Sequence, residues 1–446
     1  ADLTLREGGF GQLLPGADVA VVDEAHHFPD VAQGFFNISI ASGQVRDLLS
    51  DIREELAATG QGGAVVDETL GGLRDGLARL ADGLPAGPDT RPWQDGEASL
   101  EEPLEELAEQ LDELALSLSD LSDESSALRR CRERARESAT AVEKILGARN
   151  DSALRWIRRS QRGFSINLTP LDTSAQLAEL LESQHCNWIF TSATLAVGDD
   201  FGHFRQRLGL VDIACRRIPS PFDFARIARL YLPAGLPEPD DPSYTASAVA
   251  AALPLIEASG GRAFMLFTSH RALRLAADVL ASDRSFHYPL LVQGEAPRSR
   301  LLEQVATLPD AVLLGTATFW EGVDIRGDGL VLVVIDRLPF ASPGDPLLAA
   351  RLDAIRREGG NPFRDYQLPQ AVLALKQGVG RLIRDYDDHG VVMICDPRIQ
   401  HRSYGRVFLN SLPPMPVLHD ANAAREFLHA TGSFTDARRK GEAMPW

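Results

Sequence analysis

Lysine is almost absent from this chain of 446 residues. None of Lys144, Lys376 and Lys440 is followed by serine or threonine, so the chain contains no G-x-x-x-x-G-K-[ST] phosphate loop. Almost all of the remaining fixed positive charge is carried by arginine. A lysine that grips the β and γ phosphates of a nucleotide therefore cannot be assigned in this sequence.

Cysteines and long apolar runs are also scarce. No pair of cysteines has C-x-x-C spacing, which argues against a disulfide framework and a zinc site and indicates reduced thiols in a cytoplasmic protein. No run approaches the ~18 apolar residues of a membrane span. The first residues lack the features of a signal peptide and a starting methionine, so we expect an internal fragment or a processed boundary. The four cysteines are Cys131, Cys186, Cys215 and Cys395.

The charge that is present is mainly negative, with a formal net charge of -18. Such a charge repels nucleic acid at long range, so any nucleic-acid binding must use local basic grooves. Acidic residues are dense over 97–113 and 120–124, while arginines are dense over 129–136 and 155–162. The charge pattern therefore separates two acidic stretches from two basic ones.

The apolar pattern predicts an α/β fold interrupted by a helical insertion. Residues 18–22 read as a buried strand, and residues 42–148 read as acidic helices with no strand pattern and a loop over 83–96. Strand and helix patterns return from residue 164, and the proline-rich residues 219–242 are expected to form a linker. The later elements alternate, which predicts a parallel sheet covered on both faces. Predicted strands are 187–190, 262–267, 288–292, 311–315, 330–335 and 390–395, and predicted helices are 172–181, 245–258, 269–281, 299–307, 346–358, 367–385 and 404–409.

Two carboxylates follow the first predicted strand. Asp23 and Glu24 lie where that strand ends, which is the usual place for ligand chemistry in an open α/β sheet. The first acid suits a hydrated Mg²⁺, because this ion takes one or two carboxylates together with phosphate oxygens and water. The second suits the orientation of an attacking water. A solvated acidic turn is the alternative interpretation.

A second group of polar residues lies in the predicted helix 367–385. Gln377, Arg381 and Arg384 are separated by four and three residues, so the three side chains would share one helix face. Two guanidinium groups there could bind one phosphate in pairs of hydrogen bonds. Gly380 inside the helix would cost about 1 kcal/mol relative to alanine, which indicates close approach of another group. A solvated polar stripe is the alternative.

Small hydroxyl residues follow three of the predicted strands. Hydroxyl groups and backbone N–H groups at strand ends can bond nucleic-acid phosphates, although each hydroxyl could equally serve as a helix N-cap. Nearby, Glu321 and Asp324 could bond hydroxyls or arginines, and Trp320 is expected to be a core anchor. The candidate nucleic-acid contacts are Ser192, Thr194, Thr268, Ser269, Thr316 and Thr318.

The order of these motifs resembles that of superfamily 2 helicases. Asp23-Glu24-Ala25-His26 is followed by the Ser-Ala-Thr, Phe-Thr-Ser, Glu-Gly-Val-Asp and Gln-x-x-Gly-Arg-x-x-Arg segments. Residues 318–324, 336–340 and 377–384 resemble the iron–sulfur branch typified by XPD and the bacterial DinG and YoaA helicases. The resemblance implies RecA-like motor domains with parallel sheets, the first one incomplete, and an inserted helical domain like the Arch of that branch.

The resemblance also implies roles for residues. Asp23 would hold Mg²⁺, Glu24 would activate water, and His26 would couple nucleotide state to the DNA-facing motif. Arg381 and Arg384 would reach the γ-phosphate. Gln377, Gly380, Glu321 and Asp324 would lie near the nucleotide.

The activity that the resemblance implies is ATP-dependent translocation 5′ to 3′ on single-stranded DNA with unwinding of duplex, in DNA repair or replication. ATP and Mg²⁺ are the implied cofactors, and forked or single-stranded DNA is the implied partner. The protein would be a monomer, with a replication or repair protein as a further implied partner. A 4Fe-4S cluster is implied for the full-length parent alone, with no ligand in this chain. The implied parts are motor domain 1 in 1–40 and 163–240, the insertion in 41–162, motor domain 2 in 241–420, and a tail, with a frayed end, in 421–446.

Two functions remain open from the sequence. The first is the C-terminal portion of a helicase, in which case residues 1–446 alone are expected to be inactive for lack of the loop lysine. The second is a non-catalytic helicase-like module that binds DNA or protein. The retained carboxylates and arginines favour the first, because a binding module has no need of a hydrolysis set.

Overall fold

The structure is a computed structural model in which the chain divides into two compact units. Unit 1 consists of residues 1–191, 205–211 and 342–362, and unit 2 of residues 192–204, 212–341 and 363–446. The structure describes residues 16–60, 63–84, 90–93, 98–119, 121, 125–148, 151–308, 310–316, 319, 329–342 and 344–439.

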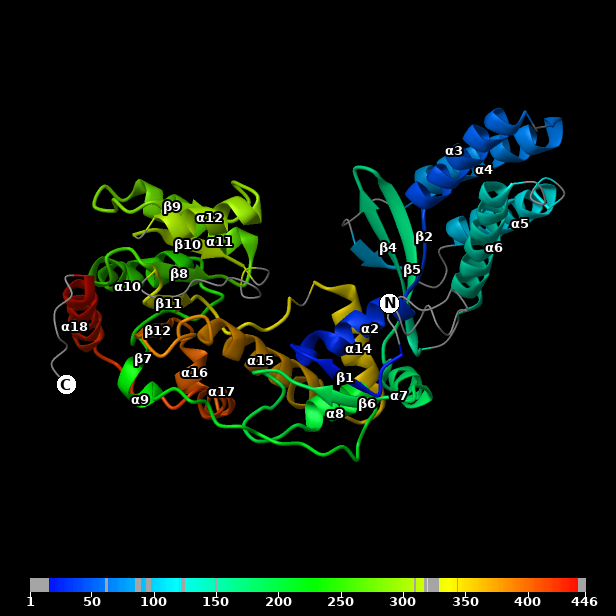
Figure 1. Ribbon diagram of the computed structural model, residues 1–446. Helices are drawn as coiled ribbons and strands as arrows, with labels where there is room; N and C mark the ends of the chain where they lie inside the picture. The colour runs from blue at the N-terminus through cyan, green and yellow to red at the C-terminus, as the bar shows by residue number, and fades with distance from the viewer. Residues whose placement is uncertain are drawn as a thin grey trace. The chain divides into compact units, whose positions relative to one another are not determined.

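Unit 2 is built on a seven-stranded sheet (Figure 1). Every strand pair in it is parallel, as the alternation of strands and helices in the sequence predicts. Because all the strands run the same way, their carboxyl ends meet at one edge of the sheet. In spatial order the strands are β13 (Val417–Leu418), β7 (Ala228–Tyr231), β12 (Gly390–Ile394), β11 (Leu332–Ile335), β8 (Ala263–Leu266), β10 (Val312–Gly315) and β9 (Leu290–Val292).

Helices cover both faces of this sheet (Figure 1). The strand side chains alternate between two buried clusters: in β11, Leu332 and Val334 join one cluster, whereas Val333 and Ile335 join the other. This is why these strands read as continuous apolar runs rather than as alternating ones. One face carries α10 (Tyr244–Ser259), α11 (His270–Ser282) and α18 (Ala421–Arg439), and the other carries α12 (Arg298–Thr307), α15 (Leu368–Val379), α16 (Arg398–His401) and α17 (Gly405–Ser411).

Unit 1 contains a small parallel sheet formed by β1 (Val19–Val22) and β6 (Asn187–Phe190). The register pairs Val22 with Phe190, so both strands end at the same level. The bounds of the two strands agree with the predicted strands 18–22 and 187–190. The prediction that 18–22 is a buried strand is wrong, because Val19 and Val21 are 50% and 63% exposed. Around them lie η1 (Ala25–His27), α2 (Phe28–Phe36), α7 (Ser174–Ser183) and α8 (Gly202–Leu208), the last of which begins in unit 2.

The insertion between β1 and β6 contains helices and a four-stranded antiparallel sheet. The prediction that residues 42–148 carry no strand is wrong at β3, and the predicted loop 83–96 contains that strand. The helices are α3 (Ser42–Thr59), α4 (Ala64–Gly83), α5 (Ala98–Ser117) and α6 (Ser126–Gly147), and the sheet order is β2 (Ile38–Ala41), β5 (Gly163–Pro170), β4 (Ala153–Ser160) and β3 (Thr90–Pro92).

The antiparallel sheet was not predicted because arginines interrupt the apolar pattern of its strands. On β4 the buried positions are Arg155 and Ile157, and the guanidinium of Arg155 lies 4.8 Å from the centre of the Trp93 ring. A charged residue at an inward position breaks the apolar alternation by which a strand is recognised. The basic run 155–162 therefore forms most of a β-hairpin strand and its turn rather than an exposed patch alone.

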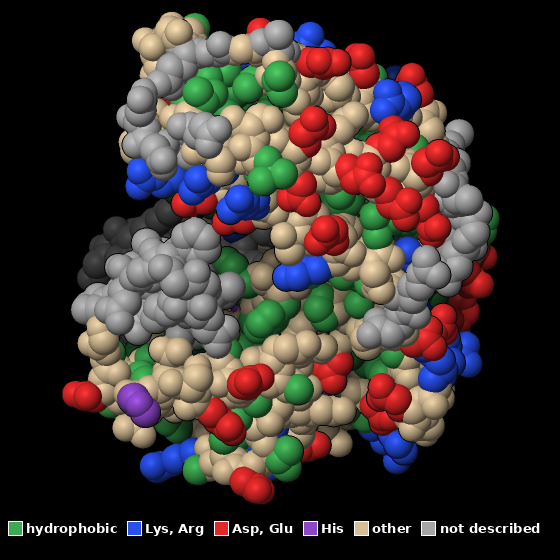
Figure 2. Space-filling view, turned by 90° about the vertical axis from the view of Figure 1, so that its right-hand side faces the viewer, with side chains coloured by type: hydrophobic (Ala, Val, Ile, Leu, Met, Phe, Trp, Pro, Cys, Tyr) green, Lys and Arg blue, Asp and Glu red, His purple; other side chains and the backbone are tan. Residues whose placement is uncertain are grey.

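The acidic character of the insertion is carried by the exposed side of α5. Its leucines are buried in the insertion core, with Leu104, Leu107 and Leu111 at helical spacing. Its exposed acids follow the same spacing on the opposite side, and Figure 2 shows acidic side chains on this side of the molecule, with arginines interspersed. These acids are Glu102, Glu105, Glu109, Asp112 and Glu113.

Three further predictions need correction. The expected linker 219–242 contains β7, which pairs with β12 inside the large sheet. The predicted helix 367–385 ends at Val379, so its last six residues are not helical. The tail is not simply frayed, because Ala424 and Leu428 of α18 are fully buried against the sheet.

Unit 1 also receives one segment from late in the chain. Helix α14 (Pro346–Arg357) belongs to it, although α14 lies between β11 and β12 in the sequence. Arg351 of this helix donates to Leu171 O at 3.0 Å and to Gln33 Oε1 at 2.7 Å. No helix among the described residues is long and apolar enough to cross a membrane.

Candidate nucleotide and nucleic-acid sites

The first site lies where β1 and β6 end. Thr191 Oγ1 donates a hydrogen bond of 2.8 Å to Asp23 Oδ1. This bond, together with one from the backbone N–H of Glu24, lowers the pKa of the Asp23 carboxyl below its ordinary value. Asp23 is therefore an ionised, exposed carboxylate, the form that binds Mg²⁺. The sequence did not identify Thr191 as its partner, because only strand pairing brings the two residues together.

Glu24 has an unusual backbone conformation. Its φ of 49° and ψ of 41° lie in the left-handed region, and it is the one non-glycine residue with positive φ among those that the structure describes. The conformation is fixed by bonds on either side, from Ala25 N to Thr191 O at 2.9 Å and from His27 N to Glu24 O at 3.1 Å. Strain of this kind concentrates at functional sites.

His26 restrains the side chain of Glu24. Its Nδ1 lies 3.3 Å from Glu24 Oε2, and its own side chain is 11% exposed against 66% for Glu24. The ring of His26 also lies 3.8 Å, centre to centre, from that of His27. The predicted residues Asp23, Glu24 and His26 are thus brought together in one short turn in unit 1.

The segment that follows β6 leaves unit 1 and belongs to unit 2. Ser192 Oγ accepts a bond of 3.1 Å from Thr194 N, and the two hydroxyl oxygens are 3.3 Å apart. Ser192 is half-buried, but Thr194 is only 3% exposed. Thr194 would therefore reach DNA only after a local rearrangement.

This segment is fastened to the helices of unit 2. Lys376 Nζ donates to Ala196 O at 2.9 Å, and Gly198 N donates to Ser411 Oγ at 3.0 Å. Burial lowers the pKa of Lys376, to which nearby Arg217 contributes. No sequence pattern indicated that the lysine next to Gln377 holds the Ser-Ala-Thr segment.

The predicted phosphate-binding arginines lie beyond the end of α15. Gln377 is in its last turn, whereas Gly380, Arg381 and Arg384 follow it in a turn, so the expectation of one continuous helix face is wrong. The chain turns here because Asp388 accepts two backbone bonds. Its Oδ2 receives Arg384 N at 2.7 Å and Asp385 N at 2.8 Å.

Asp388 is 4% exposed and forms the base of this turn. It was not recognised from the sequence, where it stands as one acid among Asp385, Asp387 and Asp388. Its bonds hold the backbone of Arg384 while leaving that arginine half-buried.

Other predicted contacts lie at the carboxyl edge of the large sheet. Thr268 and Ser269 follow β8 and are exposed, and Ser269 Oγ caps α11 by accepting from Ala272 N at 3.1 Å. Thr316 follows the neighbouring strand β10, is 5% exposed, and bonds Gln293 Oε1 through its N at 2.6 Å and its Oγ1 at 3.0 Å. Parallel pairing of β8 with β10 places these residues at one edge. Thr318, Trp320, Glu321 and Asp324 lie outside the described residues.

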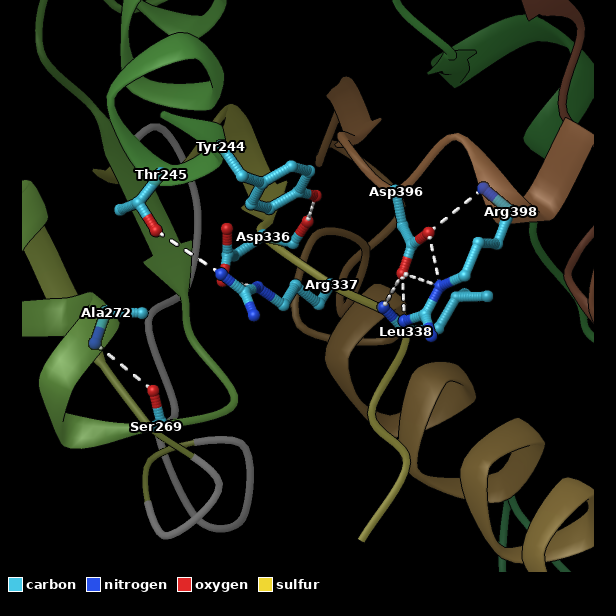
Figure 3. A network of polar contacts seen from close by, with 9 residues as sticks. All are labelled: Tyr244, Thr245, Ser269, Ala272, Asp336, Arg337, Leu338, Asp396 and Arg398. Atoms are coloured by element: carbon cyan, nitrogen blue, oxygen red, sulfur yellow. Dashed lines mark hydrogen bonds and ion pairs between the residues drawn. The ribbon is translucent and has the colours of Figure 1, made fainter. Parts of the chain in front are cut away.

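A charged network follows β11 at the same edge (Figure 3). Arg337 Nε lies 3.3 Å from Asp336 Oδ2, and the guanidinium carbon lies 4.7 Å from the centre of the Tyr244 ring. Asp336 is 2% exposed, and neither of its carboxylate oxygens has a hydrogen-bond partner among the described residues. Burial raises the pKa of Asp336 to about 7, against the opposing effect of Arg337.

The neighbouring strand β12 carries a better-formed pair. Asp396 is fully buried and receives Arg398 Nε at 2.9 Å and Arg398 Nη2 at 2.7 Å on its two oxygens, as Figure 3 shows. Asp396 also accepts from Leu338 N at 2.8 Å. This pair ties the end of β12 to the loop after β11.

The described side chains fit Mg²⁺, but they do not fit an iron–sulfur cluster. Asp23 fits Mg²⁺, because it is exposed, ionised and positioned by a hydroxyl. Across the described part of the chain, no group of three or more His, Cys, Asp or Glu side chains could hold a metal, and the four cysteines are free. An iron–sulfur cluster therefore has no ligand set on these residues.

Known proteins share much of this sequence. The chain is 41% identical over 440 residues to the ATP-dependent DNA helicase YoaA of Escherichia coli, covering 96% of this chain and 67% of that protein. The chain belongs to the YoaA/DinG family of ATP-dependent DNA helicases. Residues 252–415 match the model of the helicase C-terminal domain.

Other relatives support the family and the fold. The ATP-dependent helicase DinG of Mycobacterium tuberculosis is 37% identical over 280 residues, which cover 61% of this chain and 42% of that protein. The solved structure of apo XPD superposes with a TM-score of 0.58 at 15% identity, covering 93% of this chain and 79% of that one. At that identity the likeness concerns the fold, and it confirms the predicted RecA-like α/β class.

Proposed function

We propose that this chain provides the acids that activate water, the arginines that bind the γ-phosphate, and the DNA contacts of a helicase that moves 5′ to 3′ on single-stranded DNA and unwinds duplex. One observation carries the proposal. Asp23 and Glu24, at the end of β1, are positioned by the residue that ends β6, since Thr191 bonds the Asp23 side chain and the backbone beyond Glu24. A purely structural turn has no need of an ionised acid beside a strained one.

Asp23 would hold the magnesium ion that accompanies ATP. When bound, this ion neutralises charge on the β and γ phosphates. The hydroxyl of Thr191 occupies one lone pair of Asp23 Oδ1 and fixes the carboxylate plane, so Oδ2 remains for the ion or its waters.

Glu24 would orient and deprotonate the attacking water. Its carboxylate is exposed to water, and the contact of one carboxylate oxygen with His26 orients the side chain. Through the same contact, a shift of His26 would move Glu24, which is the coupling role proposed for this histidine.

Unit 2 would contribute the groups that bind the γ-phosphate. Arg381 and Arg384 are the proposed arginine contacts, and the turn over Asp388 fixes the backbone of Arg384. A positioned arginine stabilises transition-state charge in phosphoryl transfer and raises turnover by large factors. Gln377, Gly380, Glu321 and Asp324 remain proposed neighbours of the nucleotide.

DNA would contact the hydroxyl groups predicted from the sequence. The exposed Thr268 and Ser269 are the best placed, and Thr316 supports the same edge through Gln293. The full-length parent would carry the 4Fe-4S cluster and act as a monomer in DNA repair or replication, with a possible protein partner. The complete set of proposed contacts is Ser192, Thr194, Thr268, Ser269, Thr316 and Thr318.

The test compares Glu24→Gln with Glu68→Gln in the full-length protein. Glu68 is an exposed glutamate of α4 and serves as the matched control. We expect Glu24→Gln to lower DNA-stimulated ATP turnover at least a hundredfold, because a positioned general base contributes about 10² to 10⁴ in rate, while DNA affinity is kept. The Glu68 variant should match the wild type.

The direction of movement along single-stranded DNA is tested separately, with duplexes that carry a 5′ or a 3′ single-stranded tail. The proposal expects unwinding of the 5′-tailed duplex alone.

Two outcomes would contradict the proposal. Near wild-type ATP turnover by the Glu24→Gln variant would overturn the role of Glu24, and DNA binding with no ATP turnover in the wild type would favour the non-catalytic module.

A further inference from the structure

Arg337 lies in the motif segment 336–340, but the proposed function assigns it no role. It follows β11, and β11 pairs with β8, which pairs with β10. The carboxyl ends of these three neighbouring parallel strands therefore place Arg337 on the same edge as Thr268 and Thr316. This inference rests on the proposed use of that edge for DNA.

The contacts of Arg337 are long, so its guanidinium can still donate hydrogen bonds to a ligand. The distance from Nε to Asp336 Oδ2 is 3.3 Å, and the bond from Nη2 to Thr245 Oγ1 is 3.5 Å long. Both lie at or beyond the long end of ordinary hydrogen bonds, whereas charge-assisted pairs are usually 2.7 to 2.9 Å. The side chain is 29% exposed.

Arg398, in the same unit, is an arginine whose guanidinium is held by short hydrogen bonds. Its side chain is 26% exposed, close to the value for Arg337. Its Nε and Nη2 are nevertheless held by Asp396 in a bidentate pair at 2.9 and 2.7 Å. The two arginines thus differ in how firmly a carboxylate holds them, not in exposure.

We propose that Arg337 binds a backbone phosphate of single-stranded DNA. The guanidinium carbon of Arg337 lies over the Tyr244 ring, and this cation–π contact keeps the group oriented, which lowers the entropy lost on binding. A planar guanidinium with spare N–H donors matches the phosphate geometry. A chain with a net charge of -18 needs such local positive groups to bind DNA at all.

The buried carboxyl beside Arg337 supports this role. Because the pKa of Asp336 is raised to about 7, its negative charge is only partly present near neutral pH. The positive charge of Arg337 is then incompletely cancelled and remains available to a phosphate. A purely structural arginine would instead be expected to pair closely with an ionised acid, as Arg398 does.

The test measures the affinity of the full-length protein for fluorescent oligothymidine over a range of salt concentrations. Arg337→Gln should weaken binding about tenfold, as loss of one charged hydrogen bond predicts. It should also reduce the slope of log affinity against log salt by about 0.7, the value for one single-strand phosphate contact. A structural role would leave that slope unchanged.

Arg398→Gln is the matched control and should leave the salt slope at its wild-type value. Arg337→Lys keeps the charge and should retain the slope with weaker binding. Arg337→Met also removes the charge, and it replaces the glutamine variant if that one does not fold. Thermal unfolding reports folding of each variant.

Thr268→Ala separates this inference from the proposed function. Weaker DNA binding by Thr268→Ala with an unchanged salt slope for Arg337→Gln would overturn the inference alone. If neither variant affected DNA binding, this edge would not bind DNA, and the proposed contacts would fall with it.

Discussion

The buried carboxyl of Asp336 makes the stability of unit 2 depend on pH. Asp336 is 2% exposed, lies against Arg337, and has Asp396 near enough to raise its pKa further. The Tyr244 hydroxyl bonds the Asp336 carbonyl oxygen and not its carboxylate. Replacement by asparagine keeps the size of the side chain and removes its charge, so Asp336→Asn isolates the ionisation of one group.

The sign follows from the direction of the pKa change. The pKa of Asp336 is raised from 3.8 to about 7 on folding, so between these values the folded protein holds a proton that the unfolded chain has released. That proton stabilises the folded state at low pH, and its contribution is lost as pH rises through 7. The difference of about three in pKa corresponds to about 4 kcal/mol, of which about 3 kcal/mol falls between pH 5 and 8.

The assay compares urea unfolding midpoints of wild type and Asp336→Asn at several pH values. The difference between the two free energies of unfolding at each pH removes the contribution of the other titrating groups. Because only the wild type has a carboxyl at position 336 to ionise, the variant should gain stability relative to the wild type as pH rises from 5 to 8. Asp353→Asn, which changes an exposed acid paired with Arg356, should show no such trend. A constant difference between Asp336→Asn and wild type over this range would refute the argument from burial.

Two further predictions concern the proposed ATP site. Glu24→Gly should raise stability by about 1 kcal/mol, because glycine adopts the left-handed conformation without strain, while ATP turnover is abolished; Glu24→Gln should abolish turnover with no such gain, as thermal unfolding and ATPase assays would show. Asp388→Ala removes the acceptor of two backbone bonds and should lower turnover at least tenfold with little change in KM, because each bond contributes about 1 kcal/mol to holding the turn. Asp388→Asn keeps an oxygen acceptor and should recover part of the turnover, and equal loss in both variants would show that the charge, rather than the turn, matters.

The sequence predicted the repeating α/β part of the molecule well. Strands 330–335 and 390–395 are continuous apolar runs, and such runs have few alternatives to a buried parallel strand once helices flank them. It also placed Asp23, Glu24 and the hydroxyl residues at strand ends, since that position depends only on where each run stops.

The sequence by itself therefore determined the fold class and the family, and it supplied the acids and arginines that we propose for the ATP site. Tertiary structure decided which of these groups are held, and by what. Thr191 reaches Asp23 because two strands 168 residues apart in the chain are paired, and Lys376 holds the segment after β6 by donating to Ala196 O, 180 residues away. Arg155 and Arg337 gain their roles from aromatic rings distant in the chain. Such contacts depend on long-range packing, whereas sequence patterns report only local periodicity and motif order.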